Sequence, residues 1–138
     1  AFAGSQEVVK ADWVGQGQHI NAIGGDSVGK TELETAVLYK ADKLVVEFLT
    51  QTLVEGEIQN LDKPNELVLV ELWEIISGKK PGRQSEKEFT DFDGVGFALE
   101  DYCTLVYMYE LSQKLGIFTE LDIIPQLKDP KDLFGLLA

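Results

Sequence analysis

The chain has 138 residues, of which 44% are hydrophobic, and its 24 acidic residues against 12 basic ones give a net charge of −12 at neutral pH. This length is sufficient for one ordinary hydrophobic core. The excess of negative charge repels nucleic-acid phosphates and anionic lipid headgroups alike, so we expect a protein that binds neither nucleic acid nor a membrane surface.

The first half of the chain predicts strands that alternate with helices. A short apolar run at residues 19–23 ends in two glycines, and residues 32–41 then favour a helix. The β-branched run at residues 43–48 is typical of a buried parallel strand. Residues 52–61 predict the beginning of another helix, which Gly56 weakens.

The second half continues this alternation. Residues 66–79 predict a strand-like start followed by a helix, which Gly78 is suited to end. Residues 88–93 alternate in polarity as a third short strand. Residues 94–116 predict the longest helix, whose apolar stripe consists of Val95, Ala98, Leu99, Tyr102, Leu105, Val106 and Tyr109.

Strands that alternate with helices predict the α/β class with a parallel sheet. Three strands make less than a doubly wound domain, so we expect residues 1–138 to form one partial domain. No apolar run is long enough to span a bilayer, and we expect a cytoplasmic protein. With a single Cys103 and a single His19, the sequence predicts no internal disulfide and no thiolate or imidazole metal site.

One glycine-rich turn matches a nucleotide-binding motif. Residues 24–31, GGDSVGKT, satisfy the phosphate-loop pattern G-x-x-x-x-G-K-[ST], between an apolar run and a predicted helix. A phosphate-loop NTPase also needs a carboxylate at the end of a nearby strand to hold magnesium, and only Glu47 approximates it. Asp26 would moreover lie among the phosphate oxygens. An NTPase remains one alternative.

Five segments of the sequence, taken together in their order and spacing, favour a different class of protein from the NTPases. They are HINAIGGD with GKTEL behind it, EGEIQ at 55–59, ELW at 71–73, GRQS at 82–85 and DFDGVGFALEDY at 91–102. Together they resemble the ornithine cyclodeaminase/mu-crystallin family, whose members also include ketimine reductases and archaeal alanine dehydrogenases. The resemblance implies a Rossmann-like NAD-binding domain joined to a substrate and dimerisation domain, with a homodimer as the full-length protein.

The resemblance covers only the C-terminal part of such an enzyme. The dinucleotide fingerprint G-x-G-x-x-G is not present, because GQGQHI at 15–20 has Ile20 in place of the last glycine and runs into a strand. The family's basic residues for the substrate carboxylate belong to sequence upstream. We therefore expect the C-terminal half of the Rossmann-like domain, plus a long helix and a tail that returns to the dimerisation domain, as a fragment that is inactive alone.

The activity implied is NAD-dependent conversion of L-ornithine, or a related amino acid, to L-proline and ammonia, with the hydride taken from the α-carbon and returned within each turnover. By the resemblance Asp26 is the catalytic proton shuttle and binds substrate together with Val95. The cofactor-binding residues implied are Ile23, Gly24, Gly25, Asp26, Lys30 and Gly94.

Plainer interpretations of these residues stay open. Asp26 also suits a turn or a helix cap, and Lys30 suits a solvated position at the start of a helix. We interpret His19 as structural, because it precedes the motif and alternates with apolar residues. A non-catalytic oligomerisation or regulatory module is a third hypothesis, beside the cyclodeaminase and the NTPase.

Overall fold

The computed structural model describes residues 7–62, 67–121, 123 and 131, in two compact units divided after Glu100. Almost all of the predicted C-terminal tail lies outside these residues. No helix in the described part of the chain is long and apolar enough to cross a membrane.

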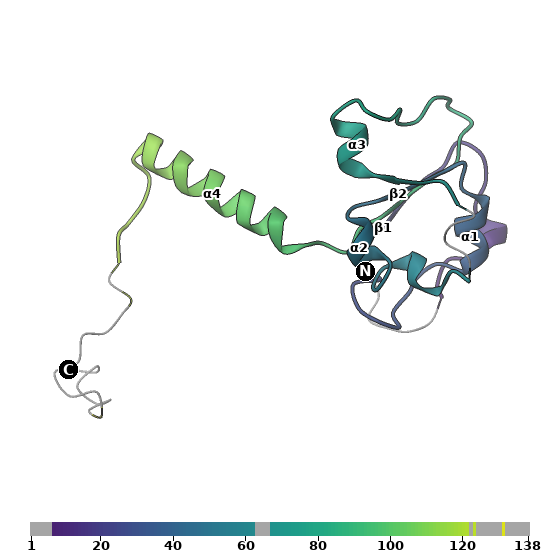
Figure 1. Cartoon of the computed structure of the whole chain (residues 1–138), viewed down its shortest axis with the longest axis horizontal. Helices are drawn as coiled ribbons and strands as arrows, with labels where there is room; N and C mark the ends of the chain where they lie inside the picture. Colours follow the sequence, from purple (N-terminus) through teal and green to yellow (C-terminus); the bar gives the residue numbers. More distant parts are fainter. Residues whose placement is uncertain (1–6, 63–66, 122, 124–130, 132–138) are drawn as a thin grey trace. The chain divides into compact units, whose positions relative to one another are not determined.

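The first unit contains a parallel sheet, which confirms the predicted α/β class (Figure 1). Its strands lie in the order β1-β4-β2-β3, and every neighbouring pair is parallel. The bounds are β1 (His19–Ala22), β2 (Lys43–Val46), β3 (Leu69–Glu71) and β4 (Thr90–Asp93). The strand-like start predicted within residues 66–79 is therefore a paired strand, which makes one strand more than the three predicted.

The helices of the first unit are short. They are α1 (Thr35–Lys40), α2 (Leu49–Thr52) and α3 (Leu72–Ile76), with the 3-10 turns η1 (Ala11–Trp13) and η2 (Glu57–Asn60). The helix predicted for residues 32–41 begins later, because Leu33 forms a β-bridge with Val9 instead of a helical turn. The single helix predicted for residues 52–61 is wrong. Helix α2 ends at Thr52, and the 3-10 turn η2 begins only after Gly56, whose φ of 79° lies in the left-handed region.

The hydrophobic core lies against one face of the sheet, and α1 and α3 lie on different sides of the strands (Figure 1). Strand residues alternate between the two faces, so Ile20, Leu44 and Asp91 share the core face. The buried apolar residues of this core are Ala11, Ala22, Leu33, Val37, Leu38, Leu44, Val46, Ile58, Leu61 and Phe89.

The other face of the sheet carries an open groove. Its cavity has a volume of about 440 Å³, and α3 forms one wall of it. The lining residues are His19, Asn21, Lys43, Val45, Leu72, Ile75, Gly82, Arg83, Thr90 and Phe92.

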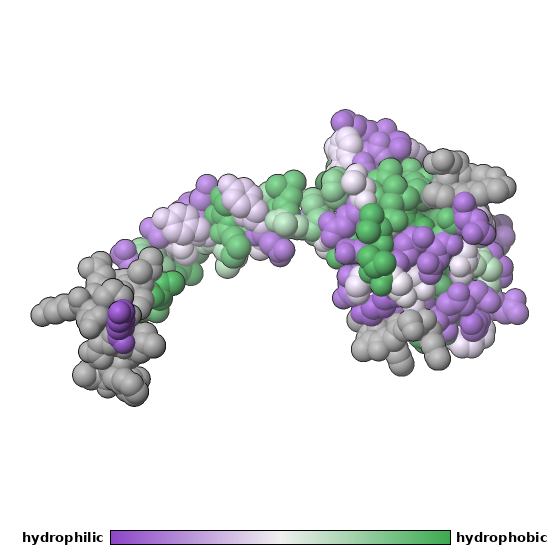
Figure 2. Space-filling view, turned by 60° about the horizontal axis from the view of Figure 1, so that its bottom comes forward, coloured by the Kyte–Doolittle hydropathy of each residue, from purple (hydrophilic) through white to green (hydrophobic). Residues whose placement is uncertain are grey.

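The long helix predicted for residues 94–116 is present as α4 (Ala98–Leu115). None of its residues is buried, and the predicted apolar stripe is exposed along it, with Leu105 at 69% and Tyr109 at 67% of full exposure. Figure 2 shows hydrophobic side chains, in green, between paler and purple ones along the helix. The sequence pattern therefore predicted the helix correctly.

Candidate functional site

The two segments predicted to carry the site meet at the carboxyl edge of the sheet. The Asp26 loop (residues 23–30) follows β1, and the Gly94 turn (residues 94–96) follows β4. Ala22 and Asp93 are register partners at the ends of these adjacent parallel strands. The amide of Gly94 donates a hydrogen bond to the carbonyl of Ala22 at 3.0 Å. Segments about 70 residues apart in sequence are thus neighbours, as parallel pairing requires.

Glycines allow the backbones at this edge to approach closely. A Cβ on Gly25 would lie 3.0 Å from Glu57 Oε1 and 3.1 Å from the carbonyl oxygen of Lys30. A Cβ on Gly56 would lie 2.7 Å from Asp93 Oδ1 and 2.9 Å from Val95 Cγ1. Larger residues at these two positions would push the loops apart.

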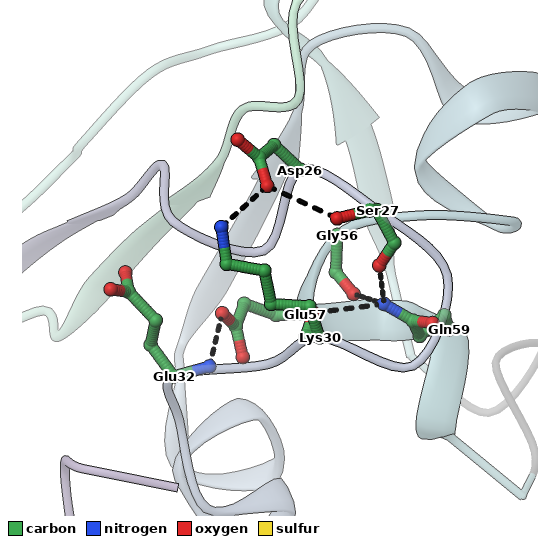
Figure 3. A network of polar contacts seen from close by, with 7 residues as sticks. All are labelled: Asp26, Ser27, Lys30, Glu32, Gly56, Glu57 and Gln59. Atoms are coloured by element: carbon green, nitrogen blue, oxygen red, sulfur yellow. Dashed lines mark hydrogen bonds and ion pairs between the residues drawn. The ribbon is translucent and has the colours of Figure 1, made fainter. Parts of the chain in front are cut away.

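Asp26 is an exposed, ionised carboxylate within its loop. Its Oδ1 accepts a hydrogen bond from Lys30 Nζ at 2.6 Å and another from Ser27 Oγ at 3.3 Å (Figure 3). The Lys30 ammonium lowers the pKa of Asp26 below its usual value. Both of these hydrogen bonds are to Oδ1, and Oδ2 is directed away from Lys30 and Ser27 (Figure 3).

The cofactor residues named from the sequence lie at the same edge and differ in exposure. Ile23 and Asp26 are exposed, Lys30 is half-buried, and the three glycines Gly24, Gly25 and Gly94 are buried. Ile23 is 57% exposed, although it is apolar. Its Cγ2 would lie 3.6 Å from a Cβ on Gly94, so the two residues are neighbours. Gly24 and Gly25 are buried behind them, where a Cβ on Gly24 would overlap the carboxylate of Glu32.

Sequence reasoning missed one residue that shapes the Gly94 turn. Glu47, which directly follows β2, accepts hydrogen bonds from the backbone amides of Val95, at 3.1 Å, and of Gly96. These partners lie 48 and 49 residues further along the chain, so no local pattern indicated the contact. From the sequence, Glu47 was a candidate only for a magnesium ligand.

Three buried carboxyl groups, Asp91, Asp93 and Glu57, lie at and behind this edge, each at most 2% exposed. Burial raises the pKa of Asp91 to about 8 and that of Asp93 to about 7. Asp93 Oδ2 accepts hydrogen bonds from the amides of Glu57 and Ile58, but these do not offset its desolvation. Burial also raises the pKa of Glu57.

The phosphate-loop geometry is not present in residues 24–31. In that motif the helix opens at the Gly-Lys-Thr end, so that its first amides face the phosphate. Here α1 begins only at Thr35, and Thr31 is buried. Lys30 turns back to Asp26 inside the same loop (Figure 3). The motif match therefore lacks the helix that makes it a phosphate site.

His19 lies on the open face of the sheet, at the beginning of β1. Its Nδ1 is 2.8 Å from Thr90 Oγ1 and its Nε2 is 3.1 Å from Asn21 Oδ1. These contacts agree with the structural interpretation of this residue. The GQGQHI segment at residues 15–20 runs directly into β1, as predicted from the sequence. It does not follow a strand, as a dinucleotide fingerprint would.

Comparison with known proteins decides the family. The sequence profile of the ornithine cyclodeaminase/mu-crystallin family matches residues 2–115. The chain belongs to this family. The resemblance drawn from the five sequence segments is thereby confirmed.

Two members of the family are particularly informative. The ornithine cyclodeaminase of Agrobacterium tumefaciens is 42% identical over 130 residues, which is 94% of this chain and 36% of that protein. The alanine dehydrogenase of Archaeoglobus fulgidus is 44% identical over 116 residues, or 79% of this chain and 35% of that protein. The chain thus spans about a third of the length of these relatives.

Solved structures show the same fold. An archaeal alanine dehydrogenase dimer with bound NAD has a TM-score of 0.73 at 37% identity, over 87% of this chain and 38% of that one. A Thermococcus litoralis Δ1-pyrroline-2-carboxylate reductase in complex with NADH and L-proline has a TM-score of 0.70 at 32% identity, over 83% and 37% of the two chains.

Proposed function

We propose that this chain forms the C-terminal half of the NAD-binding domain of an ornithine cyclodeaminase-like enzyme, as part of a longer protein. The observation that carries the proposal is the meeting of the Asp26 loop and the Gly94 turn at the carboxyl edge of a parallel sheet, in a chain 42% identical to an ornithine cyclodeaminase. Ligands of open parallel sheets bind outside the carboxyl ends of the strands.

The residues at this edge fit the nicotinamide end of NAD. Ile23 offers an exposed apolar side chain, and the buried Gly94 beside it lets the two turns approach each other closely. NAD, when bound, supplies a hydride acceptor that becomes the hydride donor at the end of the same turnover. Relatives of known structure hold NAD or NADH, which supports the same cofactor for this family member.

Asp26 is proposed to handle protons at the δ-amine of L-ornithine. The exposed carboxylate is charged at neutral pH, since the neighbouring Lys30 lowers its pKa below 3.8, and a charged carboxylate attracts the substrate's δ-ammonium group. Oδ2 is the oxygen available for that contact, because Lys30 and Ser27 both donate to Oδ1. Proton transfer to Asp26 frees the amine to attack, and its return protonates the departing ammonia. Val95, beside Gly56 at the same edge, is proposed to contact the substrate.

We also propose that the longer protein is a cytoplasmic homodimer. The archaeal alanine dehydrogenase that shares this fold is a dimer, which supports the assembly. The net charge of −12 argues against nucleic acid as a partner. The missing dinucleotide fingerprint and the basic residues for the substrate carboxylate are proposed to come from the remainder of the longer protein.

A second candidate is net oxidoreduction of an amino acid. The 44% identity to an alanine dehydrogenase over 116 residues favours it specifically. The two reactions differ in what happens to the hydride. A cyclodeaminase returns it, whereas a dehydrogenase leaves it on the cofactor.

The experiment is to incubate the longer protein with NAD⁺ and either L-ornithine or L-alanine, while NADH absorbance, proline and ammonia are measured together. The proposal expects proline and ammonia from L-ornithine in equal amounts, without net NADH. NADH accumulation from L-alanine, with no proline from L-ornithine, would replace the proposal by the dehydrogenase.

A further inference from the structure

The Asp26 loop is held by a segment that lies about 30 residues further along the chain. We call residues 56–59 the clamp segment. The amide of its first residue, Gly56, donates a hydrogen bond to the carbonyl of Gly25 at 2.6 Å. Figure 3 shows the clamp segment beside the loop, with the Gln59 side chain directed into it. The Asp26 loop contains no helix or strand, so its conformation depends on such outside bonds.

The side chain of Gln59 binds the loop around its turn. Its Oε1 accepts a hydrogen bond from the amide of Gly29 at 2.6 Å. Its Nε2 lies 2.7 Å from the carbonyl oxygen of Gly56, 3.1 Å from that of Lys30 and 3.3 Å from that of Ser27. Its two hydrogens are shared among these three acceptors, two of which belong to the loop. An amide side chain is needed for this, because it offers an acceptor and two donor hydrogens at once.

Glu57 binds the backbone that leaves the loop. Its two carboxylate oxygens accept hydrogen bonds from the backbone amides of Glu32, at 2.8 Å, and of Leu33, at 2.9 Å. Glu57 is 2% exposed and Leu33 is 3% exposed, so the buried amide of Leu33 needs this acceptor. The loop is thus held at its first glycines, at its turn and at its exit.

The clamp segment is itself attached to the strand that carries the other half of the site. The amides of Glu57 and Ile58 donate to Asp93 Oδ2, at 2.8 and 3.0 Å. Asp93 is the last residue of β4 and directly precedes the Gly94 turn. One set of hydrogen bonds therefore links the two halves of the site through residues 56–59.

We propose that Gln59 is a positioning residue that fixes Lys30 relative to Asp26, an inference that rests on the proposed function of Asp26. Gln59 does not bond to Asp26 itself. Gln59 fixes the backbone of Ser27, Gly29 and Lys30, and that backbone decides where the Lys30 ammonium meets the carboxylate. Without these bonds, the backbone between Gly25 and Glu32 has no hydrogen bonds to the Gln59 side chain and can adopt more conformations.

The test uses the longer protein with two variants of Gln59 and one control variant of Gln51, another half-buried glutamine. Gln59→Leu removes every hydrogen bond of this side chain, both those to the loop and the one to the carbonyl of Gly56. Gln59→Glu keeps an acceptor for Gly29 but loses the donors to the carbonyls, and it serves if the first variant fails to fold. Gln51→Leu is the control, because Gln51 is also half-buried but bonds locally, to Glu55 at 3.1 Å.

Both Gln59 variants are expected to lower kcat for proline formation by about tenfold or more, since small misplacements of a reacting group are costly. The acidic limb of the kcat–pH profile is expected to move to higher pH, because a loosened Lys30 no longer lowers the pKa of Asp26 as far. KM is expected to change less than kcat. The control variant is expected to leave both readouts unchanged.

The inference is overturned if the Gln59 variants match Gln51→Leu in kcat and in the pH profile. It is equally overturned if they only lower the melting temperature, with an unshifted pH profile, since that marks a purely structural role. Asp26→Asn measured in parallel separates the two ideas. If that variant is inactive while the Gln59 variants are normal, the proposed function stands and the positioning role fails.

Discussion

Replacement of Asp91 by Asn should stabilise the chain, and increasingly so as the pH rises. Asp91 lies on the core face between Ile20 and Leu44 with no exposed surface. Neither of its carboxylate oxygens has a hydrogen-bond partner among the described residues. Burial, and then the negative charges of Asp93 and Glu57, raise its pKa from 3.8 to about 8. The folded chain therefore keeps a proton that the unfolded chain releases.

The sign and the size follow from this proton difference. A carboxyl group with a raised pKa contributes fully to stability below its unfolded pKa, and the contribution is lost as the pH rises through the folded pKa. Each pH unit in that window changes the free energy of unfolding by about 1.4 kcal/mol at most. Asn does not titrate, so its advantage over Asp91 should grow by about 3 kcal/mol between about pH 5.5 and about pH 8.

The assay is urea unfolding of the 138-residue chain and of the variant at these two pH values, both above the pI of about 4.4 at which solubility is least. Asp12→Asn is the control, because Asp12 is an exposed residue of η1. Its free energy of unfolding should keep a constant difference from that of the parent. Parallel pH curves for Asp91→Asn and the parent chain would refute the reasoning, since they would mean that Asp91 is not desolvated.

Three further predictions concern ligands and the loops. The isolated chain should show no micromolar affinity for NAD⁺ by calorimetry, because it lacks the G-x-G-x-x-G fingerprint; a micromolar dissociation constant would contradict this. ATP with magnesium should not raise its melting temperature, and a rise of several degrees that disappears in Lys30→Ala would revive the NTPase. Gly56→Ala should lower the free energy of unfolding by about 2 kcal/mol or more, and by more than Gly29→Ala. Both glycines have a φ of 79°, but only Gly56 has close neighbours, so equal losses would show that crowding is unimportant.

The sheet was largely predictable because its signals are local. Residues 44–46 are apolar and form most of β2, and the two glycines shortly after β1 mark its end. Once parallel pairing is assumed, the loops after these strands must share one edge, which brings Asp26 and Gly94 to the same side. The meeting of the two halves of the candidate site follows from that topology.

The contacts that hold the site were not predictable, because they join residues far apart in sequence. Gln59 reaches a glycine 30 residues earlier, and Glu57 reaches amides 24 and 25 residues earlier. The EGEIQ segment supported the family resemblance, but nothing in it indicated that it binds the Asp26 loop. The burial of Asp91 was likewise not predictable from the pattern of polarity, since an alternating strand normally directs acidic side chains to water. Here β4 lies inside the sheet and its acidic face covers the core.

The central claim is that Asp26 transfers protons in ornithine cyclisation, and Asp26→Asn in the longer protein tests it most directly. Asn keeps the shape and the ability to form turns and caps, but it cannot take up a proton. We predict that the rate of proline formation from L-ornithine falls at least about 100-fold, while stability stays that of the parent and Asp12→Asn remains fully active. Proline formation by Asp26→Asn within about threefold of the parent would contradict the claim.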